Sequence, residues 1–128
     1  SLTLRGLNLV NGSASSGGGV VYAYGAGDIE IIDSTVRDCS AEHEGGVVWT
    51  QDSGAVSITS STVSGCSANF DGGVVFASSS GAVSIIGSSM MGCSANEYGG
   101  ATYTADTDLI VTDSTISGCN ATRGGAVY

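Results

Sequence analysis

The chain has 128 residues, with 21 glycines, no proline and 12 acidic side chains against three cationic ones, for a formal charge of −9. A chain of this length is expected to form one domain. So acidic a chain lacks the clustered cations that nucleic acids and anionic membrane surfaces require, and no apolar run is long enough to cross a bilayer. We therefore expect neither a nucleic-acid partner nor membrane insertion by this segment.

Three short apolar elements follow one another in each part of the chain. The first holds two apolar residues separated by one other residue, which predicts a strand with one buried face. The pairs are Leu2/Leu4, Ile29/Ile31, Val56/Ile58, Val83/Ile85 and Leu109/Val111. The second surrounds Leu9, Val36, Val63, Met90 and Ile116. The third follows a double glycine and reads VVY, VVW, VVF, ATY and AVY in turn. No run of ten residues has helical spacing, so the pattern predicts two or three short strands per repeat, joined by tight bends.

The repeats keep one phase along the chain. Double glycines fall at 18–19, 45–46, 72–73, 99–100 and 124–125, about 27 residues apart with a slight shortening at the end. A unit of this size cannot bury its apolar face alone. The sequence therefore predicts a solenoid in which each repeat makes one turn and parallel strands stack about 4.8 Å apart. Residues 1–128 would then form a single β-helix of roughly 4.7 coils, about 20 Å tall.

Both ends of the chain carry ordinary repeat residues, and no repeat has the character of a cap. Open sheet edges invite pairing with further strands. We therefore expect the solenoid to continue into flanking coils of a longer parent chain, or to associate end to end with other copies.

One stretch resembles a known repeat family. The sequence TVSGCSANFDGGVVF, residues 62–76, is similar to the repeats of polymorphic outer-membrane protein (Pmp) and autotransporter passengers, which pair F-x-x-N with a downstream G-G-A-[ILV]. Residues 63–66 stand in place of F-x-x-N and residues 72–75 in place of G-G-A-[ILV]. The motif Asn is Cys in four copies, and the motif Phe is Val or Met in three of those copies. The resemblance implies a right-handed parallel β-helix, an adhesive or structural role outside the cell or at its surface, and no catalytic residues.

Four cysteines occupy one position of the repeat: Cys39, Cys66, Cys93 and Cys119. Stacked Cα atoms about 4.8 Å apart fall inside the range of roughly 4.4–6.8 Å for disulfides. Bridges Cys39–Cys66 and Cys93–Cys119 would leave no thiol over, and an acidic, lysine-free chain favours them. The alternative is a ladder of buried free thiols, each a small apolar side chain. Four sulfurs in one row cannot converge on zinc, so we expect no metal site and no cofactor.

An aromatic residue follows each double glycine: Tyr22, Trp49, Phe76, Tyr103 and Tyr128. In one interpretation these rings face the core together with the column that contains Val20 and Val47. In the other, the column that contains Val21 and Val48 faces inward and the rings form an outer strip, as the family pattern favours. An exposed aromatic strip could bind a polysaccharide or another protein. The strip is thus the candidate binding surface, and a carbohydrate-binding module is the alternative function.

Two polar features have plainer interpretations. Stacked hydroxyls precede the second element (Ser34-Thr35, Ser61-Thr62, Ser88-Ser89 and Ser114-Thr115), and turn chemistry explains them better than ice binding does. Asn11 and Asn120 begin N-x-[ST] sequons and are candidate glycosylation sites.

The sequence gives little support for a catalytic site. His43 lies between two glutamates in a loop, where we expect it to be solvated. Asp33 and Asp113 share a register position three coils apart, about 14 Å at the strand spacing, which is too far for a catalytic pair. We therefore expect no enzyme activity but an extracellular structural or adhesive solenoid, with glycans or cell-surface molecules as partners besides further coils. The least favoured alternative is a non-catalytic fragment of a β-helix polysaccharide-degrading enzyme.

Overall fold

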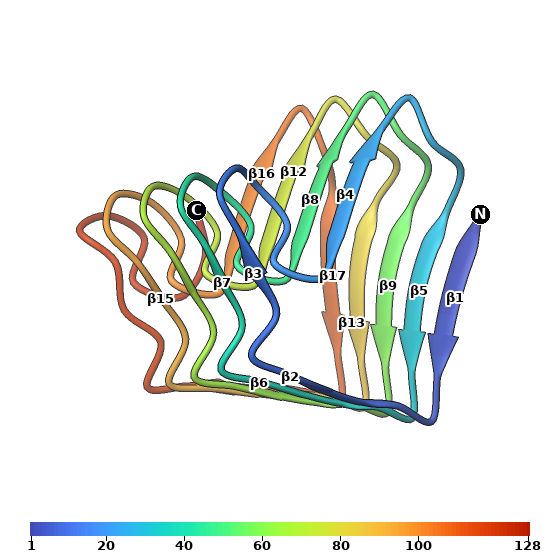
Figure 1. Ribbon diagram of the computed structural model, residues 1–128, viewed down its shortest axis with the longest axis horizontal. Coiled ribbons are helices and arrows are strands. Elements are labelled where there is room, and N and C mark those ends of the chain that lie inside the picture. The colour runs from blue at the N-terminus through green and yellow to red at the C-terminus, as the bar shows by residue number, and fades with distance from the viewer.

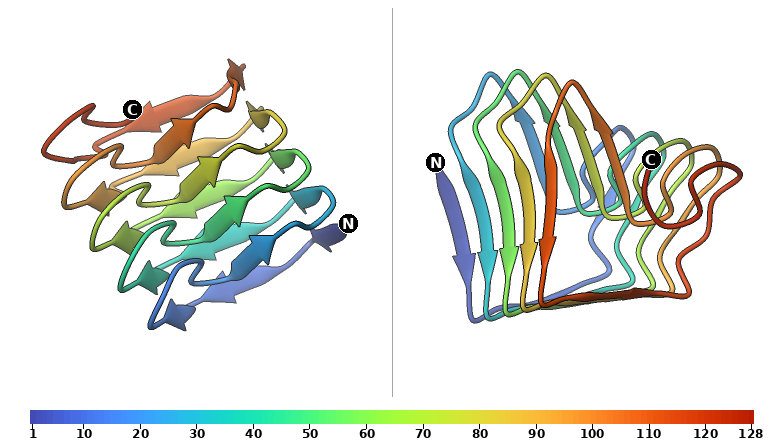
Figure 2. Two further views of the ribbon diagram at one scale, coloured as in Figure 1. Left: turned by 90° about the horizontal axis from the view of Figure 1, so that it is seen from above. Right: turned by 180° about the vertical axis from the view of Figure 1, so that it is seen from behind.

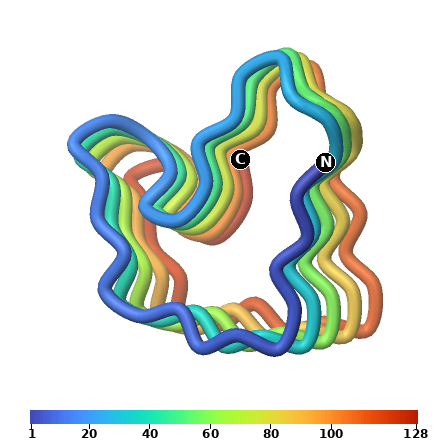
Figure 3. The backbone as a smooth tube through the Cα atoms, turned by 45° about the vertical axis from the view of Figure 1, so that its right-hand side comes forward, coloured from blue at the N-terminus to red at the C-terminus, as the bar shows by residue number.

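The computed structural model describes residues 1–128 and contains 18 β-strands and no helix. The chain winds into a column of stacked coils, with the two termini at opposite ends (Figures 1 and 2). Seen from the N-terminal end, the chain runs clockwise as it recedes, so the solenoid is right-handed (Figure 3). The prediction of a single right-handed parallel β-helix is confirmed.

Four parallel sheets form the sides of the column. Sheet 1 contains β1 (Leu2–Arg5), β5 (Ile29–Ile32), β9 (Val56–Thr59), β13 (Val83–Ile86) and β17 (Leu109–Thr112). Sheet 2 contains β2 (Asn8–Val10), β6 (Thr35–Arg37), β10 (Thr62–Ser64), β14 (Ser89–Met91) and β18 (Thr115–Ser117). Sheet 3 contains β3 (Ser13–Ala14), β7 (Ser40–Ala41), β11 (Ser67–Ala68) and β15 (Ser94–Ala95). Sheet 4 contains β4 (Val21–Tyr24), β8 (Val48–Gln51), β12 (Val75–Ser78) and β16 (Thr102–Ala105).

Each complete coil thus has four strands, and the prediction of two or three per repeat was too low. The strands of sheet 3 are only two residues long, too short for an alternating pattern to reveal them. The register is as predicted, because equivalent residues of consecutive repeats are paired throughout, as in Ile31 with Ile58 and Val63 with Met90.

The core is a set of vertical columns of like side chains. Ile31, Ile58 and Ile85 from sheet 1 are fully buried, and so are Val36, Val63 and Met90 from sheet 2. Core columns are uncovered in the end coils: Leu2, in the column of Ile29, is 42% exposed, and Val111, in the column of Ile31, is 44% exposed. Burial in this fold is therefore supplied by the neighbouring coil rather than by the coil itself.

The double glycine makes a tight reversal between sheets 3 and 4. Gly72 has φ of +64°, a conformation that side chains disfavour. A Cβ added at Gly73 would lie 2.1 Å from the carbonyl oxygen of Gly100 in the next coil. The first glycine is thus required by its backbone conformation and the second by the close approach of stacked backbones.

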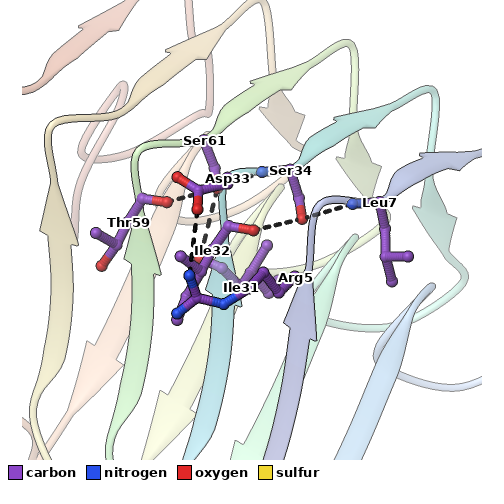
Figure 4. A network of polar contacts seen from close by, with 8 residues as sticks. All are labelled: Arg5, Leu7, Ile31, Ile32, Asp33, Ser34, Thr59 and Ser61. Carbon is purple, nitrogen blue, oxygen red and sulfur yellow. Dashed lines mark hydrogen bonds and ion pairs between the residues drawn. The ribbon is translucent and has the colours of Figure 1, made fainter.

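The serine row lies inside a corner between sheets 1 and 2 (Figure 4). Ser34 Oγ donates to the carbonyl oxygen of Ile32 at 2.8 Å and accepts the N–H of Leu7 from the preceding coil at 3.1 Å. The N–H of Ser34 in turn donates to Ser61 Oγ at 3.1 Å, and the pattern continues through Ser88 to Ser114. Ser34, Ser61 and Ser88 are buried, so the hydroxyls of these serines serve the turn, as predicted.

Candidate functional site

One aromatic residue from each coil, four of them in sheet 4, contributes to a continuous stack along the column. Successive ring centroids are 4.4, 5.9, 5.1 and 5.7 Å apart and the rings are within 8° of parallel. The strands of sheet 4 are paired in register, which places each ring directly above the one before it. We call Tyr22, Trp49, Phe76, Tyr103 and Tyr128 the aromatic ladder.

The aromatic ladder lies on the outer face of sheet 4. Val48 and Val75 point inward and are fully buried, whereas Tyr22 and Tyr128, at the two ends of the ladder, are 57% and 52% exposed. Of the two orientations left open by the sequence, the structure has the outward one. Trp49 is an exception in exposure, at 9%, because the loop before sheet 4 folds back over it.

Stacking limits what the ladder can bind. A sugar ring packs its C–H groups on the face of an aromatic ring, but here the faces are covered by the rings above and below. Tyr22 and Tyr128 are the first and last rings of the ladder. Only their ring faces toward the two ends of the column have no ladder neighbour. This geometry favours a packing role for the ladder, and carbohydrate binding stays a prediction.

A second column, which the sequence analysis did not identify, lies beside the ladder. It is in the loop that precedes each strand of sheet 4 and folds back toward the ladder. Its members at the C-terminal end form a polar and aromatic cluster with the ladder: the Tyr98 ring is tilted against Tyr128 at 4.5 Å between centroids. The Arg123 guanidinium donates to the Tyr98 hydroxyl and lies 5.3 Å from the centre of its ring. The equivalent positions are Gly17, Glu44, Asp71, Tyr98 and Arg123. Because this column changes residue type in every coil, it leaves no repeat signal in the sequence.

Burial affects two ionisable groups in this region. Desolvation raises the pKa of the Asp71 carboxyl, and the nearby Glu97 and Glu44 raise it further, against a hydrogen bond from the Tyr98 N–H that lowers it. Desolvation also raises the pKa of Tyr103, with Asp71 as the next cause. The two groups lie close enough for their charges to interact.

The four cysteines are free thiols, so the predicted bridges Cys39–Cys66 and Cys93–Cys119 do not form. Stacked Cβ atoms are about 4.8 Å apart in a parallel sheet, beyond the usual 3.5–4.5 Å across a disulfide. The prediction depended on the Cα spacing, which lies within the disulfide range even where the Cβ atoms are too far apart for a bridge. The alternative of a thiol ladder is the one present, with Cys39, Cys66 and Cys93 buried in the core.

The thiols of the last two coils influence each other. The pKa of Cys93 is raised to about 11. Hydrogen bonding to Cys119 lowers this pKa, whereas hydrogen bonding to Cys66 and burial both raise it. Hydrogen bonding with Cys93, followed by burial, raises the pKa of Cys119. Both groups are therefore thiols rather than thiolates at neutral pH.

The remaining predicted positions lie apart from one another. His43 is exposed, with its ring 5.4 Å from that of Phe70. Asp33 and Asp113 are exposed at corners of the column with φ of 50° and 49°. Asn11 and Asn120 are exposed, as glycosylation would require. No three His, Cys, Asp or Glu side chains converge as metal ligands.

The structure contains no helix that is long and apolar enough to cross a bilayer. Comparisons of the chain with family models, curated proteins and solved structures found no match. The fold and the ladders define the chain as a parallel β-solenoid, while its resemblance to Pmp and autotransporter repeats stays a prediction.

Proposed function

We propose that this chain is a structural or adhesive solenoid of the cell surface or extracellular space, a stiff column that stacks on further coils of the same motif. The single observation that carries the proposal is that sheets 1 and 2 and their apolar columns reach both end faces, with β1 and β2 at one end and β17 and β18 at the other. The cell-surface setting is supported by the acidic, lysine-free composition, the exposed sequon residues Asn11 and Asn120, and the family resemblance.

The N-terminal end face is hollow and apolar. Sheets 1 and 4 leave a cavity of about 310 Å³ there, lined mostly by hydrophobic residues that include Leu2, Val21 and Tyr22. The N–H groups of Leu2 and Gly6 donate to coil 2. Because successive residues of a parallel strand bond to opposite neighbours, the N–H groups of Thr3 and Arg5 point to the open edge.

The two end faces are not equally good partners. At the C-terminal face, Ser114, Ile116 and Cys119 retain the residue types of their columns. At the N-terminal face, Leu7 replaces the corner serine and Gly12 replaces the cysteine, and Ala26 replaces the serine of a second hydroxyl ladder through Ser53. A second copy placed on the C-terminal face would leave the N–H group of Ser114 without a hydroxyl acceptor, because Leu7 occupies that corner of coil 1. A coil that carries serine at the corner between sheets 1 and 2 is therefore the better partner.

Sedimentation velocity on the purified chain tests the proposal. The wild-type chain should associate head to tail only weakly. The variant Leu7→Ser, which restores the corner serine on coil 1, should associate at lower concentration. In that background Thr3→Pro removes an open-edge N–H and should abolish association, whereas the matched Thr3→Val keeps the N–H and should not.

The same samples give the contrary outcomes. A monomer at all concentrations in both the wild type and Leu7→Ser rejects coil-on-coil stacking as the function. Association that survives Thr3→Pro places the contact on another face and also rejects it. Negative-stain microscopy of the associated sample should show columns that lengthen without widening.

A further inference from the structure

We propose that Cys93 and Cys119 together bind one soft monovalent cation, Cu(I), as a linear two-coordinate bis-thiolate between the last two coils. This inference does not rest on the proposed function, although Cys119 belongs to the C-terminal end face and a coil stacked on that face would cover it. The spacing that is too wide for a disulfide suits an ion placed between the two sulfurs.

The distance along the ladder fits two metal–sulfur bonds in line. Metal–thiolate bonds are about 2.3 Å long, so two collinear bonds span about 4.6 Å. The spacing of stacked strands is about 4.8 Å. A cation can therefore occupy the midpoint between consecutive sulfurs without a change in the backbone.

The cysteine side chains make the same backbone contact in each of the four coils that carry one. Each Sγ lies beside the carbonyl oxygen two residues earlier, at 3.5 Å for Cys39, 3.4 Å for Cys66, 3.5 Å for Cys93 and 3.6 Å for Cys119. Cys119 Sγ also lies 3.9 Å from the carbonyl oxygen of Met90. The shared contact indicates that the sulfur position repeats with the coil, so consecutive sulfurs follow one another along the column.

The ligand set selects the class of metal. Soft thiolate ligands favour Cu(I) among the biological first-row ions, and Cu(I) accepts two collinear ligands. Zinc needs four ligands in a tetrahedron, and no group of even three candidate ligands is present. The expectation of no metal site depended on the four-ligand requirement of zinc, which a two-ligand ion does not have.

Access restricts the site to the last pair of thiols. Cys39, Cys66 and Cys93 are fully buried, whereas Cys119 in the terminal coil is partly exposed. A cation can approach through Cys119 and reach the sulfur of Cys93 directly below. The pair Cys39 and Cys66 lies within the core and should stay unoccupied in the folded chain.

Binding is an exchange of protons for the metal, with no change of oxidation state. Each thiol loses its proton to solvent, two Sγ–Cu bonds form, and the site gains a net charge of −1 beside solvent. The titratable groups that act on the pKa of Cys93 and Cys119 are the ladder thiols themselves, Cys66 included. Since two protons leave per ion, the apparent affinity should rise about 100-fold per pH unit near neutrality.

An anaerobic Cu(I) titration against a chromophoric chelator, read with native mass spectrometry, tests the proposal on the full chain. We expect one copper per monomer, two sulfur ligands by X-ray absorption, and the two-proton pH dependence. Cys119→Ser and Cys93→Ser should each lose this binding, while the matched control Cys39→Ser should keep it. Circular dichroism melts establish that each variant is folded, and the spectroscopy and pH dependence of the wild type need no variant.

Three results would overturn the site. Retention of the copper in folded Cys119→Ser would place it elsewhere. An affinity that rises only about tenfold per pH unit would mean that a single thiol binds the ion. A copper-linked dimer would show that the second sulfur comes from another molecule.

Discussion

The indole of Trp49 packs on the backbone of Gly17 in the preceding coil, where a Cβ would lie 2.5 Å from Cδ1 of the indole. The other coils carry side chains at this position, among them Glu44 and Asp71. The backbone therefore tolerates a side chain there, and it is the tryptophan that requires glycine. The contact explains why Trp49 is the most buried member of the ladder.

Gly17→Ala should force the indole outward and lower the free energy of unfolding by about 1–3 kcal/mol, the usual cost of overpacking. The chain has one tryptophan, so its fluorescence should shift to longer wavelength as the ring becomes solvated. Urea unfolding followed by fluorescence measures both effects. The neighbouring Ser16→Ala, at an exposed position, should change neither, and an equal loss of stability in both variants would contradict the packing explanation.

Ser61→Ala should destabilise the chain by about 1–3 kcal/mol, because it leaves the buried N–H of Ser34 without an acceptor. Ser61→Thr keeps the hydroxyl and should recover most of the loss, as Thr107 already does at the other corner. Ser67→Ala, in a strand where the hydroxyl has no hydrogen-bond partner, should stay within about 0.5 kcal/mol of wild type. Chemical denaturation of the three variants decides the matter.

Alkaline pH should weaken the fold through Cys93. Its pKa rises from 9.0 to about 11 on folding, so between these values the folded chain holds more protons than the unfolded chain. The free energy of unfolding must then fall as pH rises through this window, by at most about 3 kcal/mol. Denaturation at pH 8 to 11 should show a shallower decline in Cys93→Ser than in wild type. Parallel declines would mean that the thiol does not carry the effect.

Asp71→Asn should stabilise the chain at neutral pH by roughly 0.5 kcal/mol. Burial and the nearby Glu97 and Glu44 raise the pKa of Asp71, so its charged form is disfavoured in the folded state. The asparagine oxygen can still accept the N–H of Tyr98. The gain should vanish near pH 3, where Asp71 is protonated in both states, and a gain of equal size at both pH values would refute the electrostatic cause.

The repeat phase determined most of the fold in advance. Columns such as Ile31, Ile58 and Ile85 could be assigned to the core because a period of two within a strand and about 27 between coils fixes both face and neighbour. The direction of the aromatic ladder could not be fixed this way. The two successive residues that follow a double glycine can both be buried, as Val47 and Val48 are, so alternation alone is ambiguous there.

The site was less predictable because it depends on distances finer than a strand spacing. Cα geometry allowed both a bridge and a free pair for Cys93 and Cys119, and only the Cβ separation decides between them. Likewise, the serine row was correctly assigned to turn chemistry. The acceptor role of Ser61 toward the next coil, however, depends on the path of the corner, which composition does not specify.

Contact between coils only through their immediate neighbours has a consequence for the evolution of the chain. Deleting residues 56–82 would bring Ile31 beside Ile85 and Val36 beside Met90, with each surviving side chain meeting a counterpart of its own kind. Duplicating the same segment would lengthen the column by one coil. The height of such a protein is thus a heritable quantity that unequal recombination can adjust one unit at a time, without redesigning any interior contact.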